Sequence, residues 1–327
     1  MFAEQQDKDP AKEPASSLHL REKVCLPFLR SAQNPDGGWG YSAGLASTVE
    51  PTAWAILALG AAEGDPADIQ TVDRAADWLR KAQLPDGAWP VATGAHSGCW
   101  LTALASLALL NVDLPPNSAA KGLLWLYNAW PAEGNFLWRL RQWWPKRNNS
   151  LVRQDHSLRA WGWTPGTANW VEPTCFALLV LRNAPEQIRP PRAVGRIQMA
   201  ERMLYDRMCP GGGWSAGNPM VYGVAGEPKV GPTVWTLLTL RNQRDRTENK
   251  ISLEWLVRNY NNIQGCGSLA LAHLCLESYG RSAEPLEPKL LDFYANNRFF
   301  QNVMVASWIA LALGSLPRWL RQQDDPA

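Results

Sequence analysis

Three related phrases decide the fold of this chain: VEPTA at residues 49–53, VEPTC at 171–175 and VGPTV at 230–234. Each phrase leads directly into an apolar stretch, and each follows a loop that contains Gly-Gly-Trp or Trp-Gly-Trp. A sequence that repeats one loop-plus-helix unit predicts a repeat architecture in which each unit packs on its neighbours. The third copy differs from the others because Gly231 stands where they have Glu50 and Glu172.

The loops themselves also repeat. QNPDGGWG at 33–40 is echoed by QLPDGAW at 83–89, with looser versions at 161–163 and 209–214. Pro-Asp-Gly is typical of tight turns, because proline fixes φ, aspartate bonds to the following backbone and glycine tolerates positive φ. Each loop separates a helix of mixed polarity from a more apolar helix.

The apolar pattern predicts two sets of helices. A helix that is apolar all round belongs in the interior, whereas a half-polar helix faces water. Their alternation predicts an all-α fold, a single α6/α6 toroid in which six outer helices surround six inner ones, and no strand pattern of period two persists. The strongly apolar helices are expected at 51–60, 99–110, 173–183, 232–241, 268–279 and 302–314, and the amphipathic ones near 18–32, 69–82, 117–128, 192–208, 248–260 and 285–297.

The toroid is expected to span residues 18–315, between a polar, disordered N-terminal tail at 1–17 and a C-terminal tail at 316–327. A Trp-rich insertion at about 129–163 interrupts the repeat. Basic residues alternate there with tryptophans, a pattern typical of peripheral membrane contact. The same rings can instead fold back over the rim of the toroid while the cations stay in water, or meet a protein partner. The tryptophans concerned are Trp130, Trp138, Trp143 and Trp144.

Composition narrows the class of protein. The chain has 327 residues, and its net charge of +2 gives no reason to expect nucleic acid. Eighteen tryptophans indicate a large core, an apolar surface or an apolar cavity. The six cysteines are scattered without a Cys-x-x-Cys pair, as in reduced cytosolic proteins. No stretch approaches the roughly 20 apolar residues of a membrane span. We therefore expect a cytoplasmic protein, with membrane association only at its surface.

The loops and helix pairs together resemble the QW repeats of squalene–hopene cyclases and their relatives, which include protein prenyltransferase β subunits. The resemblance covers about residues 18–315 and implies a terpene cyclase-like α/α toroid that acts on an isoprenoid. The same fold hosts unrelated activities, so the function has to be argued from the site.

The resemblance also implies two candidate acids. In class II terpene cyclases an Asp-x-Asp-Asp-Thr-Ala motif opens an inner helix, and its middle aspartate protonates an alkene or an epoxide. Glu50 and Glu172 fall at that donor position, although the flanking aspartates are replaced, the third of them by proline. This match implies acid-initiated cyclisation or isomerisation. The alternative is structural, because an acid and a proline in the first turn also make a good helix start.

Aromatic side chains near the helix starts are candidates for a substrate cavity, since π faces stabilise developing carbocations. They can equally be spacers that pack the ring helices together. The residues are Trp54, Trp100, Trp170, Phe176 and Trp235.

Zinc is a weaker alternative. Prenyltransferase β subunits use an Asp-Gly-Cys stretch as zinc ligands, but Asp86 is followed here by Gly87 and Ala88, so the thiolate is missing. His96 and Cys99 are the nearest substitutes that could join Asp86. We therefore expect no cofactor. The rival to an enzyme is a non-catalytic toroid that binds a prenyl lipid or pairs with a partner subunit.

Overall fold

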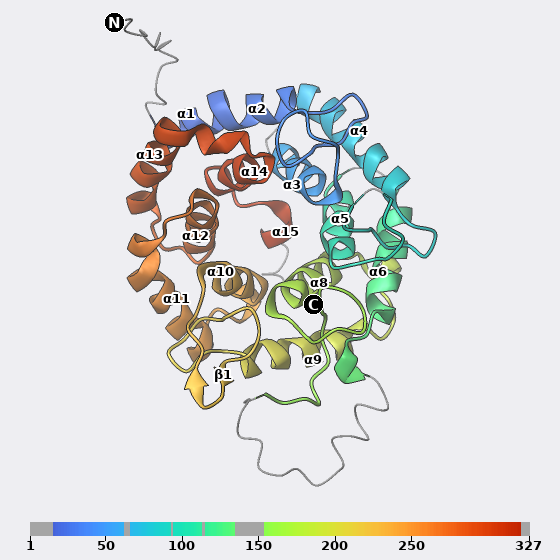
Figure 1. Cartoon of the computed structure of the whole chain (residues 1–327), viewed down its shortest axis with the longest axis vertical. Helices are drawn as coiled ribbons and strands as arrows, with labels where there is room; N and C mark the ends of the chain where they lie inside the picture. The colour runs from blue at the N-terminus through green and yellow to red at the C-terminus, as the bar shows by residue number, and fades with distance from the viewer. Residues whose placement is uncertain (1–15, 62–65, 93, 113–114, 135–153, 322–327) are drawn as a thin grey trace, which may run out of the picture.

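The computed structural model describes residues 16–61, 66–92, 94–112, 115–134 and 154–321. Within these ranges the helices form two concentric rings (Figure 1). Each inner helix contacts the next one along the chain, and the last contacts the first, so the ring closes. The inner helices are α3 (Val49–Gly60), α5 (Leu101–Leu110), α8 (Val171–Asn183), α10 (Val230–Thr239), α12 (Cys266–Ser278) and α14 (Val303–Ala312).

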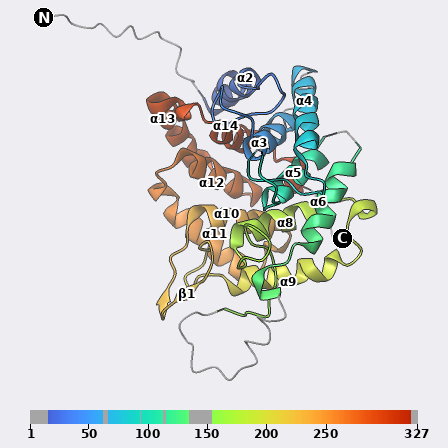
Figure 2. The ribbon, with the colours of Figure 1, turned by 45° about the vertical axis from the view of Figure 1, so that its right-hand side comes forward.

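The outer ring is built from the amphipathic helices, each of which packs on an inner helix. Its first member is a continuous run of α1 (Ser17–His19), the π-helical turn η1 (Leu20–Cys25) and α2 (Leu26–Ser31). Figure 2 shows the same two layers from another direction. The predicted all-α fold is confirmed, with helix boundaries that agree to within a few residues. The other outer helices are α4 (Pro66–Ala82), α6 (Asn117–Asn128), α9 (Ala193–Asp206), α11 (Thr247–Asn259) and α13 (Glu287–Asn297).

The inner helices are buried on all sides, as their apolar composition requires. Small residues on α3, such as Ala53, Ala55 and Ala58, have no exposed surface and let neighbouring helices approach closely. Each larger aliphatic side chain buried in this way contributes about 1.5–3 kcal/mol relative to exposure. Hydrophobic burial therefore accounts for the division into two rings.

The repeated tryptophan fastens each loop to two helices. The Trp39 indole N–H donates to the carbonyl of Leu29 at 2.8 Å, and its backbone N–H donates to Oγ1 of Thr52 at 2.9 Å. Three further repeats have the same pair of bonds: Trp89 with Leu79 and Thr102, Trp161 with Leu126 and Thr174, and Trp214 with Leu204 and Thr233. The threonine of the repeated phrase thus has a structural role, because it fixes the register of the inner helix against its loop.

The glutamine and aspartate of the loops bridge to the following outer helix. Gln33 donates to the carbonyl oxygens of Gly37 and Thr71, each at 2.9 Å. Asp36 accepts a bond from the indole of Trp78 on α4 at 3.0 Å. Gly37 has φ of +97°, which favours glycine at this turn. The loop sequence is therefore explained by the fold without any reference to catalysis.

The segment expected as a C-terminal tail contains a buried helix, which corrects that expectation. α15 (Arg318–Arg321) lies inside the ring (Figure 1), and Trp319 is only 1% exposed. Asn183, which ends α8, donates to the carbonyl of Trp319 at 2.9 Å, and Arg241, just after α10, donates to that of Leu320 at 2.9 Å. α15 therefore covers the end of the ring at which the inner helices finish. Residues 322–327 lie outside the described part.

A short hairpin, β1 (Met220–Val221) with β2 (Val224–Ala225), forms where no strand was predicted. Of the insertion tryptophans, Trp138, Trp143 and Trp144 lie outside the described residues, as do residues 1–15 of the predicted tail. Trp130 lies within the described residues, and the guanidinium carbon of Arg196 lies over its ring, 4.1 Å from the ring centroid. Among the helices that are described, none combines the length and apolar character needed to cross a bilayer.

Candidate active site

The starts of the inner helices lie at one end of the ring, which we call the mouth. Three backbone hydrogen bonds join the first turn of an inner helix to the loop that precedes another one. Trp100 N–H donates to the carbonyl of Trp163 at 2.9 Å, Val171 to Ala216 at 3.0 Å, and Val303 to Tyr41 at 2.9 Å. Glu50 and Glu172, in the first turns of α3 and α8, therefore both lie at the mouth, opposite the end that α15 covers.

The threonine hydrogen bonds put equivalent residues of four repeats in register. Two positions before each threonine stand Glu50, Trp100, Glu172 and Gly231. One helical turn further from the mouth, the sixth residue of α3, α8, α10 and α14 is aromatic in every case. Because residues i and i+4 share a face of a helix, the two glutamates lie directly above part of this aromatic layer. The layer consists of Trp54, Phe176, Trp235 and Trp308.

Glu50 has a hydrogen-bond donor. The Tyr41 hydroxyl donates to Glu50 Oε2 at 2.5 Å. Burial raises the pKa of Glu50, and the Tyr41 hydrogen bond partly opposes that shift. The pKa of Tyr41 is itself raised, by burial and by Glu50, so its phenol stays neutral and remains a donor. The Cys99 thiol, whose pKa of about 11 reflects burial and secondarily Glu50, is also neutral.

Glu172 has a different environment. Burial alone raises its pKa, and no residue in the described ranges donates a hydrogen bond to its carboxyl group. Its Oε1 lies 3.5 Å from the place that a Cβ on Gly231 would take, so Glu172 lies beside the first turn of α10. Burial therefore favours the protonated form of Glu172, whereas Glu50 has a partner that stabilises its carboxylate.

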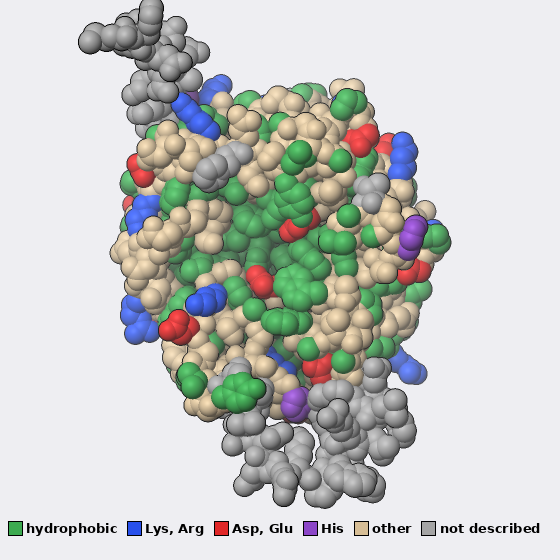
Figure 3. All heavy atoms as spheres, viewed as in Figure 1, with side chains coloured by type: hydrophobic (Ala, Val, Ile, Leu, Met, Phe, Trp, Pro, Cys, Tyr) green, Lys and Arg blue, Asp and Glu red, His purple; other side chains and the backbone are tan. Residues whose placement is uncertain are grey.

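The aromatic layer fills the ring one turn below the mouth. Trp54 stacks on Trp235 with centroids 5.3 Å apart, and Phe176 lies 4.9 Å from Trp235. These three side chains are at most 4% exposed. Figure 3 agrees, because hydrophobic side chains occupy the middle of the ring, with a few acidic ones among them. The expected central cavity is thus replaced at this level by packed aromatic side chains.

Four of the five aromatic residues named from the sequence come together. Trp100 joins the layer through Phe176, with centroids 5.2 Å apart. Trp170 does not join it, and packs instead near Gly217. The sequence analysis missed Trp308, whose ring centroid lies 5.8 Å from that of Trp54. Its place as the sixth residue of α14 could have identified it.

Of the three residues weighed for zinc, Asp86 makes other hydrogen bonds. Asp86 accepts bonds from the Trp125 indole at 3.0 Å and from the Ala88 N–H at 3.1 Å. His96 is exposed, whereas Cys99 is buried. No three His, Cys, Asp or Glu side chains within the described ranges are arranged to hold a metal ion.

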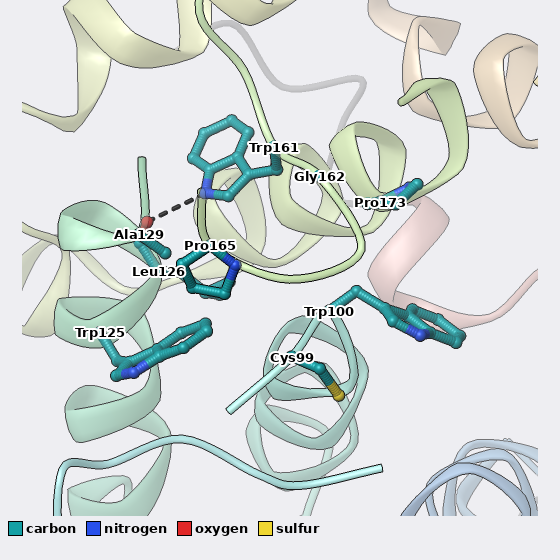
Figure 4. Close-up of a pocket in the computed structure, with 9 residues that line it drawn as sticks. All are labelled: Cys99, Trp100, Trp125, Leu126, Ala129, Trp161, Gly162, Pro165 and Pro173. Atoms are coloured by element: carbon teal, nitrogen blue, oxygen red, sulfur yellow. Dashed lines mark hydrogen bonds between the residues drawn. The ribbon is translucent and has the colours of Figure 1, made fainter. Parts of the chain in front are cut away.

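A small cavity lies beside Cys99, shown in Figure 4. Trp100, Trp125 and Trp161 contribute to its wall, and the Trp161 indole is bonded to the chain at Leu126. Its volume of about 10 Å³ has room for about one water molecule. It is too small for an isoprenoid, and the candidate active site is therefore defined by the two acids at the mouth rather than by this cavity.

Comparison with known proteins agrees with this architecture. Residues 12–99 match the squalene-hopene cyclase C-terminal domain family. No curated protein matches the chain. The resemblance to the squalene–hopene cyclase-like family is therefore confirmed by a match over the first part of the chain, together with the fold.

Solved structures give the fold over nearly the whole chain. The apo type II terpene cyclase MstE from Scytonema superposes with a TM-score of 0.53 at 14% identity, covering 90% of this chain and 99% of that one. A variant of it in complex with geranylgeranyl dihydroxybenzoate, its substrate, gives 0.54 at 13% identity, with 90% and 97% covered. Salmonella alpha-2-macroglobulin reacted with methylamine superposes with a TM-score of 0.46 at 15% identity. That superposition covers 89% of this chain but only 17% of the macroglobulin. The fold is thus that of class II terpene cyclases.

Proposed function

We propose that the chain is a class II terpene cyclase-like enzyme that protonates a polyprenyl-type substrate at the mouth and so initiates cyclisation or isomerisation. The observation that carries the proposal is the position of Glu50, a half-buried carboxyl group hydrogen-bonded by Tyr41 one turn above the aromatic layer. The Scytonema relative, which shares the fold, binds an isoprenoid substrate and supports the choice of substrate class.

Glu50 is the better donor of the two acids. A strong acid needs a conjugate base that its surroundings stabilise. Tyr41 donates a hydrogen bond to the Glu50 carboxyl group, and the position of Glu50 in the first turn of α3 favours negative charge through the helix dipole. Transfer of the Glu50 proton to an alkene carbon or an epoxide oxygen leaves a carbocation, which the faces of Trp54 and Trp100 stabilise. The Glu50 carboxylate, or another base, then takes a proton from a carbon next to the cation, which gives the product alkene. Glu172 is the second candidate, and no residue in the described ranges donates a hydrogen bond to its carboxyl group.

The depth of the site limits how the substrate binds. Four residues at 1.5 Å rise place the aromatic layer about 6 Å below the glutamates. A long polyprenyl chain therefore lies across the mouth with its reacting end down, unless the rings of Trp54 and Trp235 separate.

The test is turnover of linear C10 to C20 isoprenoid epoxides, with products identified by gas chromatography and mass spectrometry. Glu50→Gln keeps the shape of the side chain without its proton, so turnover should vanish while the melting temperature changes little. Glu227→Gln, an exposed acid that pairs with Lys229, is the control and should behave as the parent. Full activity in both Glu50→Gln and Glu172→Gln would rule out acid initiation.

The rival is a non-catalytic toroid that binds a prenyl lipid, and the filled ring favours it. In that case the parent protein binds these isoprenoids without converting them, and Glu50→Gln binds them equally well. A protein partner for such a toroid also remains a proposal.

Peripheral membrane contact through Trp130, Trp138, Trp143 and Trp144 is a separate proposal. Binding there should need both the rings and anionic lipid, and it should weaken with salt. Flotation with anionic and neutral liposomes measures it. Flotation that survives Trp143→Ala/Trp144→Ala would exclude this surface.

A further inference from the structure

A groove of about 650 Å³ lies at the seam of the ring, where the first outer helix meets the last helix pair. One wall comes from η1 and α2, and the other from α13, α14 and the connection between them (Figures 1 and 2). The volume falls within the roughly 300–1,000 Å³ typical of small-molecule sites. None of the mouth residues named above lines it, so it is a separate site.

The lining of the groove is amphipathic. Its buried side chains are apolar: Cys25, Phe299 and Ala306 are 1%, 4% and 3% exposed. Two exposed cations, Lys23 and Arg298, stand at the edge, and no acidic residue appears among the described lining residues. Burial raises the pKa of Cys25 to about 12, so the thiol is neutral and adds no negative charge. Positive charge beside an apolar floor suits a ligand with an anionic head and an apolar chain.

The backbone of both walls departs from regular geometry. Arg298, Phe299 and Gln301 have φ of 49°, 53° and 52°, in the left-handed region that residues other than glycine seldom adopt. Arg298 follows α13 at a position where glycine or asparagine is usual. The opposite wall includes the π-helical turn η1. Strained residues and π-helical turns are frequent at binding sites, because ligand contact selects them against their conformational cost.

We propose that this groove binds a single-chain amphipathic anion, an alkyl or prenyl chain that ends in a phosphate or carboxylate. The head lies beside Lys23 and Arg298, and the chain lies on Cys25, Phe28, Phe299 and Ala306. Arg298 already rests on the ring of Tyr294 at 4.6 Å, which holds its guanidinium at the groove. The proposal is independent of catalysis at the mouth.

The groove also adjoins the segment that carries Tyr41. Asn302, which lines it, pairs with Ser42, and Val303 donates to the carbonyl of Tyr41 at 2.9 Å. An occupied groove therefore contacts the strand-like segment whose Tyr41 holds Glu50. A ligand there should change the environment of Tyr41, which gives the test a spectroscopic readout.

The experiment is calorimetric titration of the whole chain with dodecyl phosphate below its critical micelle concentration, alongside dodecanol and inorganic phosphate. Dodecyl phosphate should bind best, because only it satisfies both the floor and the cations. Lys23→Gln/Arg298→Asn should weaken its binding about tenfold or more, since charge-assisted hydrogen bonds are lost. Asparagine tolerates the left-handed backbone, so this variant keeps the fold. Lys250→Gln, on α11 away from the groove, is the matched control.

A second variant tests the groove itself, independently of the two cations. Ala43 is an exposed lining residue, so Ala43→Trp should fill the groove and abolish binding without unfolding the protein. Equal binding in the parent, the double variant and Ala43→Trp would overturn the proposal. Binding to anionic vesicles without binding of monomeric dodecyl phosphate would overturn it too, because the cations would then serve a membrane surface.

Discussion

Trp54 and Trp235 stack at 5.3 Å although their helices, α3 and α10, stand three places apart in a closed ring of six. The contact therefore spans the middle of the toroid. The repeat alone suggests an open central cavity. Because of this contact, the site is instead shallow and has an aromatic floor. Two indole N–H groups, those of Trp54 and Trp308, are buried in this floor without an acceptor among the described residues. Leaving such a donor unpaired costs about 1–3 kcal/mol, so the floor is not optimised for stability alone.

Trp54→Ala should destabilise the protein by about 3–5 kcal/mol, because it removes a fully buried ring and leaves a cavity on the toroid axis. Denaturant unfolding measures the change. Trp170→Ala is the control, since Trp170 is only half-buried and outside the aromatic layer, and its loss should be clearly smaller. Equal losses in the two variants would contradict a packed floor.

Thr52→Val should cost about 1–3 kcal/mol, because the buried N–H of Trp39 loses its acceptor. Valine keeps the shape of threonine, so packing is preserved. Thr71→Val is a matched control, because that hydroxyl bonds within its own exposed helix turn, and the effect there should stay within about 0.5 kcal/mol. A small effect at Thr52 would mean that the tryptophan loop is held by other contacts.

The stability contributed by Glu172 should depend on pH. Burial raises its folded-state pKa above the ordinary value of 4.5, so its favourable contribution is complete below that value and is lost as pH rises through the folded pKa. Glu172→Gln stays neutral and should therefore be more stable than the parent at pH 7 but not at pH 4. Melting temperatures at the two pH values test this. A difference of the opposite sign would mean that the carboxylate has a partner.

Tyr41→Phe should raise the pKa of Glu50 further, because the hydrogen bond that favours its carboxylate is removed. If Glu50 is the proton donor, activity falls as pH rises through its pKa. The pH at which activity falls should therefore be higher in the variant. The maximal rate should also fall, because the conjugate base is less well stabilised. Tyr222 is exposed and lies outside the mouth contacts, so Tyr222→Phe should change neither the pH at which activity falls nor the maximal rate.

The sequence predicted the helices well, for a physical reason. Burial on all sides needs an apolar composition that is visible in one dimension, and the threonine register brings Glu50 and Glu172 to equivalent places on α3 and α8. The filled ring could not be predicted, because it depends on how side chains from opposite helices meet. Tyr41 was missed because it lies in a loop whose path is set by its pairing with α14. α15 was missed because a four-residue helix has no measurable periodicity.

The groove at the seam was also invisible in the sequence. It arises where the two ends of the repeat array meet, and its shape depends on left-handed residues such as Arg298 and Phe299, which carry no glycine signal. The aromatic residue of α14, in contrast, was predictable, since Trp308 occupies the same place in its helix as Trp54.

Closure of the ring through α3 and α14 has a consequence for biosynthesis. The first inner helix to leave the ribosome packs on the last one, so its apolar surface stays without one neighbour until nearly all of the described chain has been made. Such long-range pairing is slow to form and exposes apolar surface in the meantime. We therefore expect nascent chains that end before α14 to depend on chaperones, and release of the native ring to coincide with synthesis of α14 and α15.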